Sequence, residues 1–395
     1  MKIIGPFTQI LPLNNMSLKG ALKDEQLEII TDGGILIEND IILAVDNFQE
    51  LIQKFPTAEV EKIETEQVLL PGFIDSHTHI CFGGNRAKDF AMRLDGKTYL
   101  EIAESGGGIW STVQQTRAKT ADDLKDITLK NVEKLIRKGT TTAEVKSGYA
   151  LSIDGELKML EGINLANQEC EIDLIPTFLG AHMKAKDFNG TNKEYLEQLV
   201  SEVFPKIKAD KLANRIDIFV EQSAFSVEEG DYYLNEAKKQ GFQITIHADQ
   251  FTSGGSELAI KYNALSADHL EFFWRKRSSI FSTIRCGSNG IAWRIDWVRY
   301  AICTSPPIIR CRLLCFHCIG LESRLCTYGG FIDPSIYLSY FSEIIFSRSL
   351  GCDHLSCCKS IRSFRPRNSN KRHESRFYKF SNLKFSKYNL SPRST

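Results

Sequence analysis

The chain has 395 residues, and its formal charge of zero at pH 7 is the sum of two unlike segments. Residues 273–395 hold 21 Lys and Arg against 6 Asp and Glu, a net charge of +15, which leaves 28 against 43, or −15, for residues 1–272. The length allows one large barrel domain and a small second domain. Residues 1–272 contain two cysteines, no secretory signal pattern and no apolar run of bilayer length, so we expect neither a disulfide-rich secreted domain nor a membrane protein, and a cytoplasmic location.

Residues 1–65 are predicted to form short strands joined by turns, as in a small β-sandwich part. Residues 34–45 alternate apolar and polar side chains on both sides of Asn39-Asp40. Such a dipeptide between two alternating runs is typical of a tight hairpin turn.

A regular alternation of strands and helices follows. Helices are predicted over 122–138, 154–168, 192–209, 227–240 and 254–262, and strands over 141–145, 172–179, 216–220, 242–246 and 264–268. This order predicts parallel strands with crossover helices, either in a TIM-like barrel or in an open sheet.

The place of the polar residues decides between these two folds. They follow the last apolar residue of six successive strands, and they include His77, His79, His182, His247 and His269. A (β/α)₈ barrel gathers the carboxyl ends of all its strands at one mouth, whereas an open sheet brings together only neighbouring strands. We therefore predict an α/β fold with a TIM-like (β/α)₈ barrel whose first six βα units span residues 66–272.

The segment His77-Thr78-His79 is the strongest single indication of chemistry. Side chains at i and i+2 of a strand point the same way, so two imidazoles emerge on one side of the strand end. Imidazole is a common ligand of divalent transition metals. A lone His-x-His is more often two unrelated histidines, but three further isolated histidines at strand ends favour a metal site.

Residues 273–395 break the pattern. They carry 9 of the 11 cysteines, only two alanines and three glutamates, and no helical or alternating period. A Cys/His metal module around Cys315 and Cys318, and a nucleic-acid-binding segment, are two interpretations, but the ligand spacing is irregular and the basic residues are scattered. We favour a third, an out-of-frame translation that begins near codon 272, and expect a poorly ordered tail and an incomplete barrel.

Several segments together resemble one known family. They are Pro71–His79, Phe82–Arg86, Gly106–Ile109, Glu144–Tyr149, Thr177–His182, His247–Phe251 and Ser266–Glu271. The first resembles the opening metal motif of the amidohydrolase superfamily, and the whole set is similar to the imidazolonepropionases. The resemblance covers residues 1–272.

The resemblance implies a metal-dependent ring-opening hydrolysis in histidine degradation, in which 4-imidazolone-5-propanoate and water give N-formimidoyl-L-glutamate. It implies one zinc or iron ion, with His77, His79 and His247 as ligands. The fourth ligand of the family is an Asp in an Asp-x-Asn-Pro-Gly-Ser segment after the eighth strand. The chain has no such segment, so we expect this carboxylate, and the proton transfer that it supports, to be missing.

Roles for five further residues follow from chemistry and resemblance together. Arg86 can grip the propionate with two parallel hydrogen bonds. Tyr149, His182 and Gln250 are expected to bind substrate oxygens or ring nitrogens. His269 is expected to polarise the attacked carbonyl and stabilise the oxyanion as a catalytic residue. The Gly-rich segment after residue 105 is expected to be a flexible loop over the barrel mouth.

The expected partner is the small-molecule substrate imidazolone propionate, with no nucleic acid and no membrane, and a homodimer fits the family. Two alternatives stay open. One is another cyclic amidohydrolase or a nucleobase deaminase. The other is an inactive metal-binding pseudoenzyme with a Cys-rich interaction tail.

Overall fold

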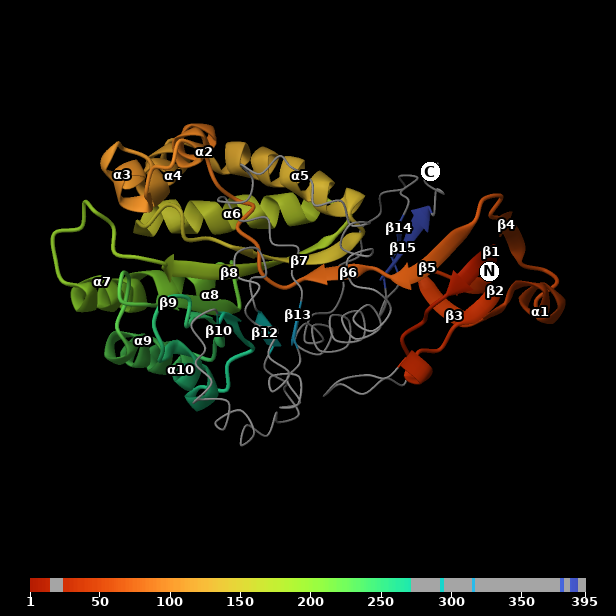
Figure 1. Cartoon of the computed structure of the whole chain (residues 1–395). Helices are drawn as coiled ribbons and strands as arrows, with labels where there is room; N and C mark the ends of the chain where they lie inside the picture. The colour runs from red at the N-terminus through yellow and green to blue at the C-terminus, as the bar shows by residue number, and fades with distance from the viewer. Residues whose placement is uncertain (15–23, 271–291, 295–314, 317–376, 380–383, 390–395) are drawn as a thin grey trace.

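The structure, a computed structural model, describes residues 1–14, 24–270, 292–294, 315–316, 377–379 and 384–389. The three interpretations of residues 273–395 fall almost wholly outside these ranges. Two sheets organise the described residues, a smaller one that holds the N-terminus and a curled parallel one (Figure 1). Among the described residues, no helix combines the length and the apolar character needed to cross a membrane.

The smaller sheet has the strand order β14-β15-β5-β1-β2-β3, and β4 pairs with β1. Its strands are β1 (Lys2–Ile10), β2 (Ile30–Glu38), β3 (Ile41–Asn47), β4 (Glu59–Lys62), β5 (Gln67–Pro71), β14 (Phe377–Lys379) and β15 (Lys384–Asn389). A short 3-10 turn, η1 (Asp24–Gln26), precedes β2, and helix α1 (Phe48–Lys54) follows β3.

The predicted hairpin is confirmed. β2 and β3 pair antiparallel, and Asn39 and Asp40 both have positive φ, 50° and 63°, as a two-residue primed turn requires. Neighbouring residues of β1 lie on opposite faces of the sheet: Ile3 packs with Phe48 of α1, and Ile4 packs in a separate cluster with Phe7. This period-two burial positions β5, which leads into the second sheet.

The second sheet is parallel throughout, in the order β13-β12-β11-β10-β9-β8-β7-β6. Its strands are β6 (Phe73–Asp75), β7 (Thr140–Lys146), β8 (Asp173–Ala181), β9 (Arg215–Val220), β10 (Gln243–Ala248), β11 (Ser266–His269), β12 (Ala292–Arg294) and β13 (Cys315–Phe316). The curled sheet with its crossover helices is an incomplete TIM-like barrel, as predicted. Within the described ranges β13 does not pair with β6, and two short strands stand where two βα units would complete the barrel.

Helices connect the strands and cover the outside of this half-barrel (Figure 1). They are α2 (Ala87–Leu94), α3 (Tyr99–Glu104), α4 (Gly108–Arg117), α5 (Ala121–Arg137), α6 (Ile153–Glu169), α7 (Asn192–Gln198), η2 (Leu199–Val203), α8 (Phe204–Ala209), α9 (Val227–Lys239) and α10 (Gly255–Lys261). The predicted helix 192–209 is present as α7, the π-helical η2 and α8. Pro205 at the start of α8 lacks the N–H that an uninterrupted α-helix would use.

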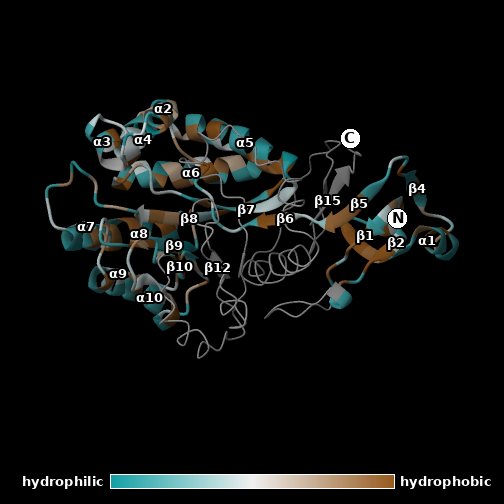
Figure 2. Cartoon of the chain, viewed as in Figure 1, coloured by the Kyte–Doolittle hydropathy of each residue, from teal (hydrophilic) through white to brown (hydrophobic). Residues whose placement is uncertain are grey.

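Helix α5 shows why the spacing of apolar residues predicted a helix over residues 122–138. Its buried residues include Leu124, Val132 and Leu135, and Figure 2 shows apolar and polar residues alternating along it. The Thr120 side chain and the Asp123 carboxylate form a capping box at its start. Gly139, at φ 86°, leads directly from the end of the helix into β7.

The Gly-rich segment is a short turn followed by a helix, and the flexibility expected there stays a prediction. Gly106, at φ 85°, lies in a short turn between α3 and α4, and Gly108 is the first residue of α4. The Asp89 carboxylate on α2 accepts a 2.8 Å hydrogen bond from the Gly108 N–H. This contact ties the segment to the neighbouring helix.

Candidate metal centre

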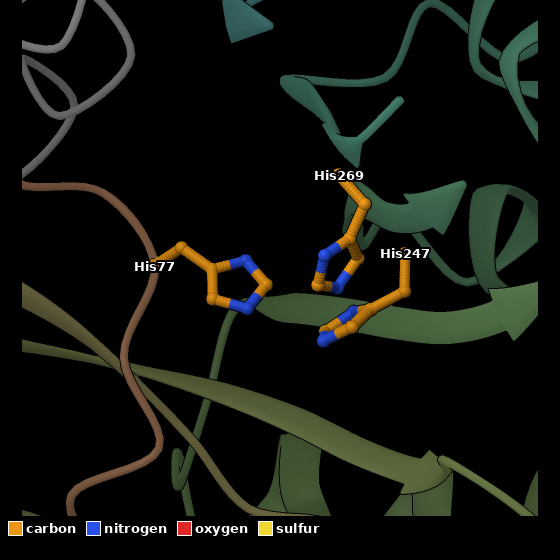
Figure 3. Close-up of side chains that lie close together, drawn as sticks. All are labelled: His77, His247 and His269. Carbon is orange, nitrogen blue, oxygen red and sulfur yellow. The ribbon is translucent and has the colours of Figure 1, made fainter. Parts of the chain in front are cut away.

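Three of the predicted ligands converge at the mouth of the half-barrel. The chain leaves β6 at Asp75, and His77 and His79 follow it, while His247 lies in β10. All three side chains are buried. The His79 Nε2 atom lies 3.2 Å from the Nε2 atom of His77 and 3.2 Å from that of His247. Figure 3 shows the rings of His77 and His247 turned toward one another.

Each of these two nitrogen pairs is spaced so that it could share one bound cation. Two nitrogens 3.2 Å apart, each about 2.0–2.1 Å from a shared zinc ion, subtend an angle of about 100°, close to tetrahedral. The buried Nδ1 atom of His79 has no hydrogen-bond partner among the described residues. A ligand bond at Nε2 would therefore anchor a ring whose Nδ1 has no partner among the described residues.

Burial also keeps these imidazoles in the form that binds a metal. It lowers the pKa of His79 well below its ordinary value of 6.5, and it lowers the pKa of His247 to about 3 although Asp217 opposes the shift. Both rings are thus neutral at pH 7, with a nitrogen lone pair available for a cation.

Two carboxylates fix the orientation of two of the rings. The Nδ1 atom of His77 lies 2.6 Å from Oδ2 of Asp268, and the Nδ1 atom of His247 lies 3.1 Å from Oδ1 of Asp217. A carboxylate accepts at both contacts, so each ring donates from Nδ1 and presents an unprotonated Nε2 to the centre. Carboxylate–histidine pairs of this kind orient ligands in metal sites.

A buried charge cluster lies directly behind these carboxylates. The Lys146 ammonium is 2.5 Å from Asp217, 2.8 Å from Glu144 and 3.5 Å from Asp268, and all four side chains are buried. Burial lowers the pKa of Lys146, but the three carboxylates outweigh it, so the net shift is upward and the lysine stays charged. Burial raises the pKa of Asp268, whereas Lys146 and His247 lower that of Asp217 against the effect of burial.

His269, the predicted catalytic residue, belongs to the same cluster. It is the last residue of β11, with φ 76°, and its ring centroid is 5.1 Å from that of His247 and 5.4 Å from that of His77. A ring nitrogen of each of these three residues lies within 4.8 Å of the others, so His269 could also contribute to holding an ion (Figure 3). Its catalytic role stays a prediction.

Tyr149 and His182 lie beside His79, one of the three predicted ligands. The centroid of the Tyr149 ring is 5.5 Å from that of His79, and the His182 ring stacks on His79 at 5.6 Å. His182 donates from Nδ1 to the Gly148 carbonyl at 3.0 Å, which leaves the lone pair of the neutral ring on Nε2. Both residues are placed where a ligand of the metal centre would meet them.

Arg86 is buried with part of its guanidinium uncommitted. Its side chain is 6% exposed; Nε donates to the Thr112 hydroxyl at 2.6 Å and Nη1 to Asp89 at 3.4 Å. Within the part of the chain that the structure describes, its buried Nη2 has no hydrogen-bond partner. A buried donor without an acceptor is costly, which points to an anionic group of a ligand. Gln250 is half-buried, two residues beyond the end of β10.

The sequence analysis did not identify the residues that support the ligands. Asp217, Asp268 and Lys146 are charged residues inside fully buried strands, and this unusual placement was the available signal. Glu221 directly follows β9, and its carboxylate accepts hydrogen bonds from the N–H groups of Phe251 and Thr252 at 2.8 and 3.1 Å. Its carboxylate organises the loop after β10.

The comparisons with known proteins agree with the fold. The Amidohydrolase family matches residues 68–273, and the chain belongs to this family. It is 37% identical over 270 residues to an imidazolonepropionase from Clostridium tetani and 40% identical over 262 residues to one from Thermoanaerobacter pseudethanolicus. These matches cover 68% and 66% of the chain and 64% and 62% of the relatives, so the chain spans less than two thirds of their length.

Solved structures show the same fold at low identity. An adenosine deaminase from Xanthomonas campestris with bound zinc superposes with a TM-score of 0.58 at 11% identity, covering 91% of this chain and 80% of that one. The guanine deaminase of E. coli superposes with a TM-score of 0.51 at 14% identity, covering 75% and 67%. The chain thus combines the fold of the Amidohydrolase family with a cluster of buried histidines that could hold a metal ion.

Proposed function

We propose that the chain is an imidazolonepropionase, which opens the ring of 4-imidazolone-5-propanoate by hydrolysis at a carbon–nitrogen bond. The observation that carries this proposal is the convergence of the Nε2 atoms of His77, His79 and His247, 3.2 Å apart across His79. The similarity to curated imidazolonepropionases supports the choice of substrate.

The metal is one zinc or iron ion held by His77, His79 and His247. When bound there, it would lower the pKa of a water molecule toward about 7 and supply a nucleophile at neutral pH. The carboxylates of Asp217 and Asp268 keep the His247 and His77 rings turned toward this position.

The remaining side chains bind and orient the substrate. The uncommitted Nη2 of Arg86 takes the propionate carboxylate. Tyr149 and His182 hydrogen-bond the ring, Gln250 recognises its amide, and His269 donates to the oxygen on which charge develops during attack. The propionate thereby fixes the ring against the metal ligands.

Proton transfer is the step for which the described residues offer no dedicated base. The Asp expected after an eighth strand is absent from the sequence, and Asp296, Asp333 and Asp353 lie outside the described residues. General base catalysis contributes about 10²–10⁴-fold to a rate. We therefore expect this chain to bind substrate and product but to turn over slowly. A cytoplasmic location and a homodimer stay predictions.

The test compares the chain with the Clostridium tetani relative in parallel assays. Imidazolone propionate, guanine and cytosine are offered to the zinc-loaded proteins, and binding of N-formimidoyl-L-glutamate is measured by calorimetry. We expect product binding by both proteins and hydrolysis of imidazolone propionate at least about 100-fold slower by this chain. Preference for guanine or cytosine would identify a deaminase instead. A folded, zinc-loaded chain that binds no product would be a metal-binding protein without this activity.

A further inference from the structure

The buried charge cluster consists of Lys146, Glu144, Asp217 and Asp268. Lys146 has no part in the proposed reaction, but it contacts the two carboxylates that orient the proposed metal ligands. Its Nζ atom contacts Asp217 and Asp268 at 2.5 and 3.5 Å. These carboxylates in turn accept from the Nδ1 atoms of His247 and His77. One ammonium group therefore connects two ligands that come from different strands.

The cluster has the geometry of a cation site in which the Lys146 ammonium takes the place of a metal ion. Oxygen and nitrogen atoms of His77, Glu144 and Asp268 lie within 4.8 Å of one another, as do those of Asp217, His247 and Asp268. The Lys146 ammonium lies within 3.5 Å of all three carboxylates. Three buried carboxylates repel one another strongly in a medium of low dielectric constant, so a central positive charge is needed to keep them together.

We propose that Lys146 is a positioning residue that acts as a built-in cation: it holds Asp217 and Asp268 in place and thereby orients His247 and His77 toward the metal. This inference rests on the metal site of the proposed function. The Thr245 hydroxyl, 3.4 Å from Nζ, and Arg215, 3.8 Å from Glu144, complete the surroundings of the cluster. Glu144 balances the charge of the lysine through Oε2, and its Oε1 accepts a hydrogen bond from the Thr177 hydroxyl at 2.6 Å.

The closing experiment measures zinc affinity by competition with a chromophoric chelator in the full chain and its variants. Lys146→Met should weaken zinc binding by about 10–100-fold, the usual effect of losing a group that supports a ligand. Because a lone deletion leaves unbalanced buried charge, the double variant Lys146→Met with Glu144→Gln removes one charge of each sign. It should fold and show the same loss of affinity.

Two variants serve as controls. Glu144→Gln removes a carboxylate of the cluster that does not orient a ring, and Glu156→Gln removes a buried carboxylate from a different network. Both should keep zinc affinity within about threefold of the unmodified chain, below the range expected for support residues.

The outcomes separate the two proposals. Equal zinc affinity of the unmodified chain and a folded double variant would overturn the positioning role of Lys146. Failure of the unmodified chain to bind zinc would instead refute the metal site itself. The spectrum of the cobalt-substituted protein gives an independent readout, because a change in ligand orientation alters its visible bands, whereas a purely structural role leaves them unchanged.

Discussion

Glu156 provides a sharp test of how the substrate side of the site is built. Its side chain is fully buried in α6, and its two oxygens accept hydrogen bonds from the N–H groups of Gly148, Ala150 and Leu151 at 2.7–2.8 Å. This loop carries Tyr149, and its Gly148 carbonyl accepts from His182. We therefore predict that Glu156→Gln disturbs Tyr149 and His182, the side chains proposed to bind substrate, without direct contact with the three proposed metal ligands.

The magnitude follows from the hydrogen bonds that glutamine cannot make. Its one carbonyl oxygen can face Ala150 and Leu151, but the Gly148 N–H then meets an amide NH₂ group. A buried donor without an acceptor costs about 1–3 kcal/mol, and a bond to a charged acceptor contributes about 1.5–3 kcal/mol. Burial raises the pKa of Glu156, so loss of the buried charge offsets part of this cost. Product binding requires the loop in its native arrangement, so restoring that arrangement at a cost of up to about 2 kcal/mol would weaken product affinity by up to about 30-fold.

Calorimetry with N-formimidoyl-L-glutamate measures this change on the zinc-loaded chain. The matched control is Glu229→Gln, the same substitution in an exposed capping box at the start of α9, where glutamine is also an accepted residue. It should leave product affinity unchanged. A folded Glu156→Gln variant with unaltered product affinity, or with zinc affinity reduced as much as product affinity, would refute the reasoning.

Three further predictions concern ligand binding, metal removal and pH. Arg86→Lys keeps the positive charge but loses the uncommitted Nη2. Product affinity measured by calorimetry should therefore fall by about tenfold, or about 1.4 kcal/mol. An unchanged affinity would exclude a carboxylate of the ligand at this position. Chelation of zinc present at about 100 times its dissociation constant should lower the free energy of unfolding by about 2.7 kcal/mol, seen as a lower midpoint in calorimetric scans; an identical midpoint would mean that no metal is bound. The pKa of Glu156 is raised in the folded state, so above pH 4.5 the folded chain binds more protons than the unfolded chain, and this residue makes the free energy of unfolding fall as pH rises through its folded pKa. Urea titrations between pH 4.5 and 8 should show that Glu156→Gln loses this slope. A slope equal to that of the unmodified chain would contradict this assignment.

Periodicity predicted most of the half-barrel because one physical pattern dominates there. Residues 122–138 place apolar side chains on one stripe, and α5 buries that stripe. The same logic worked for the hairpin at Asn39-Asp40, where local turn chemistry fixes the backbone. It failed between β6 and β7, where α2, α3 and α4 are short and depend on contacts such as Asp89 with Gly108.

The sequence was sufficient to predict the candidate metal ligands, but it was not sufficient to predict the residues that hold them in position. His77 and His79 are recognised from their spacing, and His247 from its place at a strand end. Asp217 and Lys146 are not, because their significance depends on a 2.5 Å contact between residues 71 positions apart in the sequence. Only a charged residue within a buried strand indicates such a network, and the pattern does not name its partner.

X-ray absorption at the zinc edge tests the central claim most directly, because it reports the ligand atoms of the bound ion in the full chain. The histidine site predicts three imidazole nitrogens at about 2.0–2.1 Å and no sulfur. Sulfur neighbours at about 2.3 Å would place the ion on cysteines, 9 of 11 of which lie in residues 273–395, and would contradict the account.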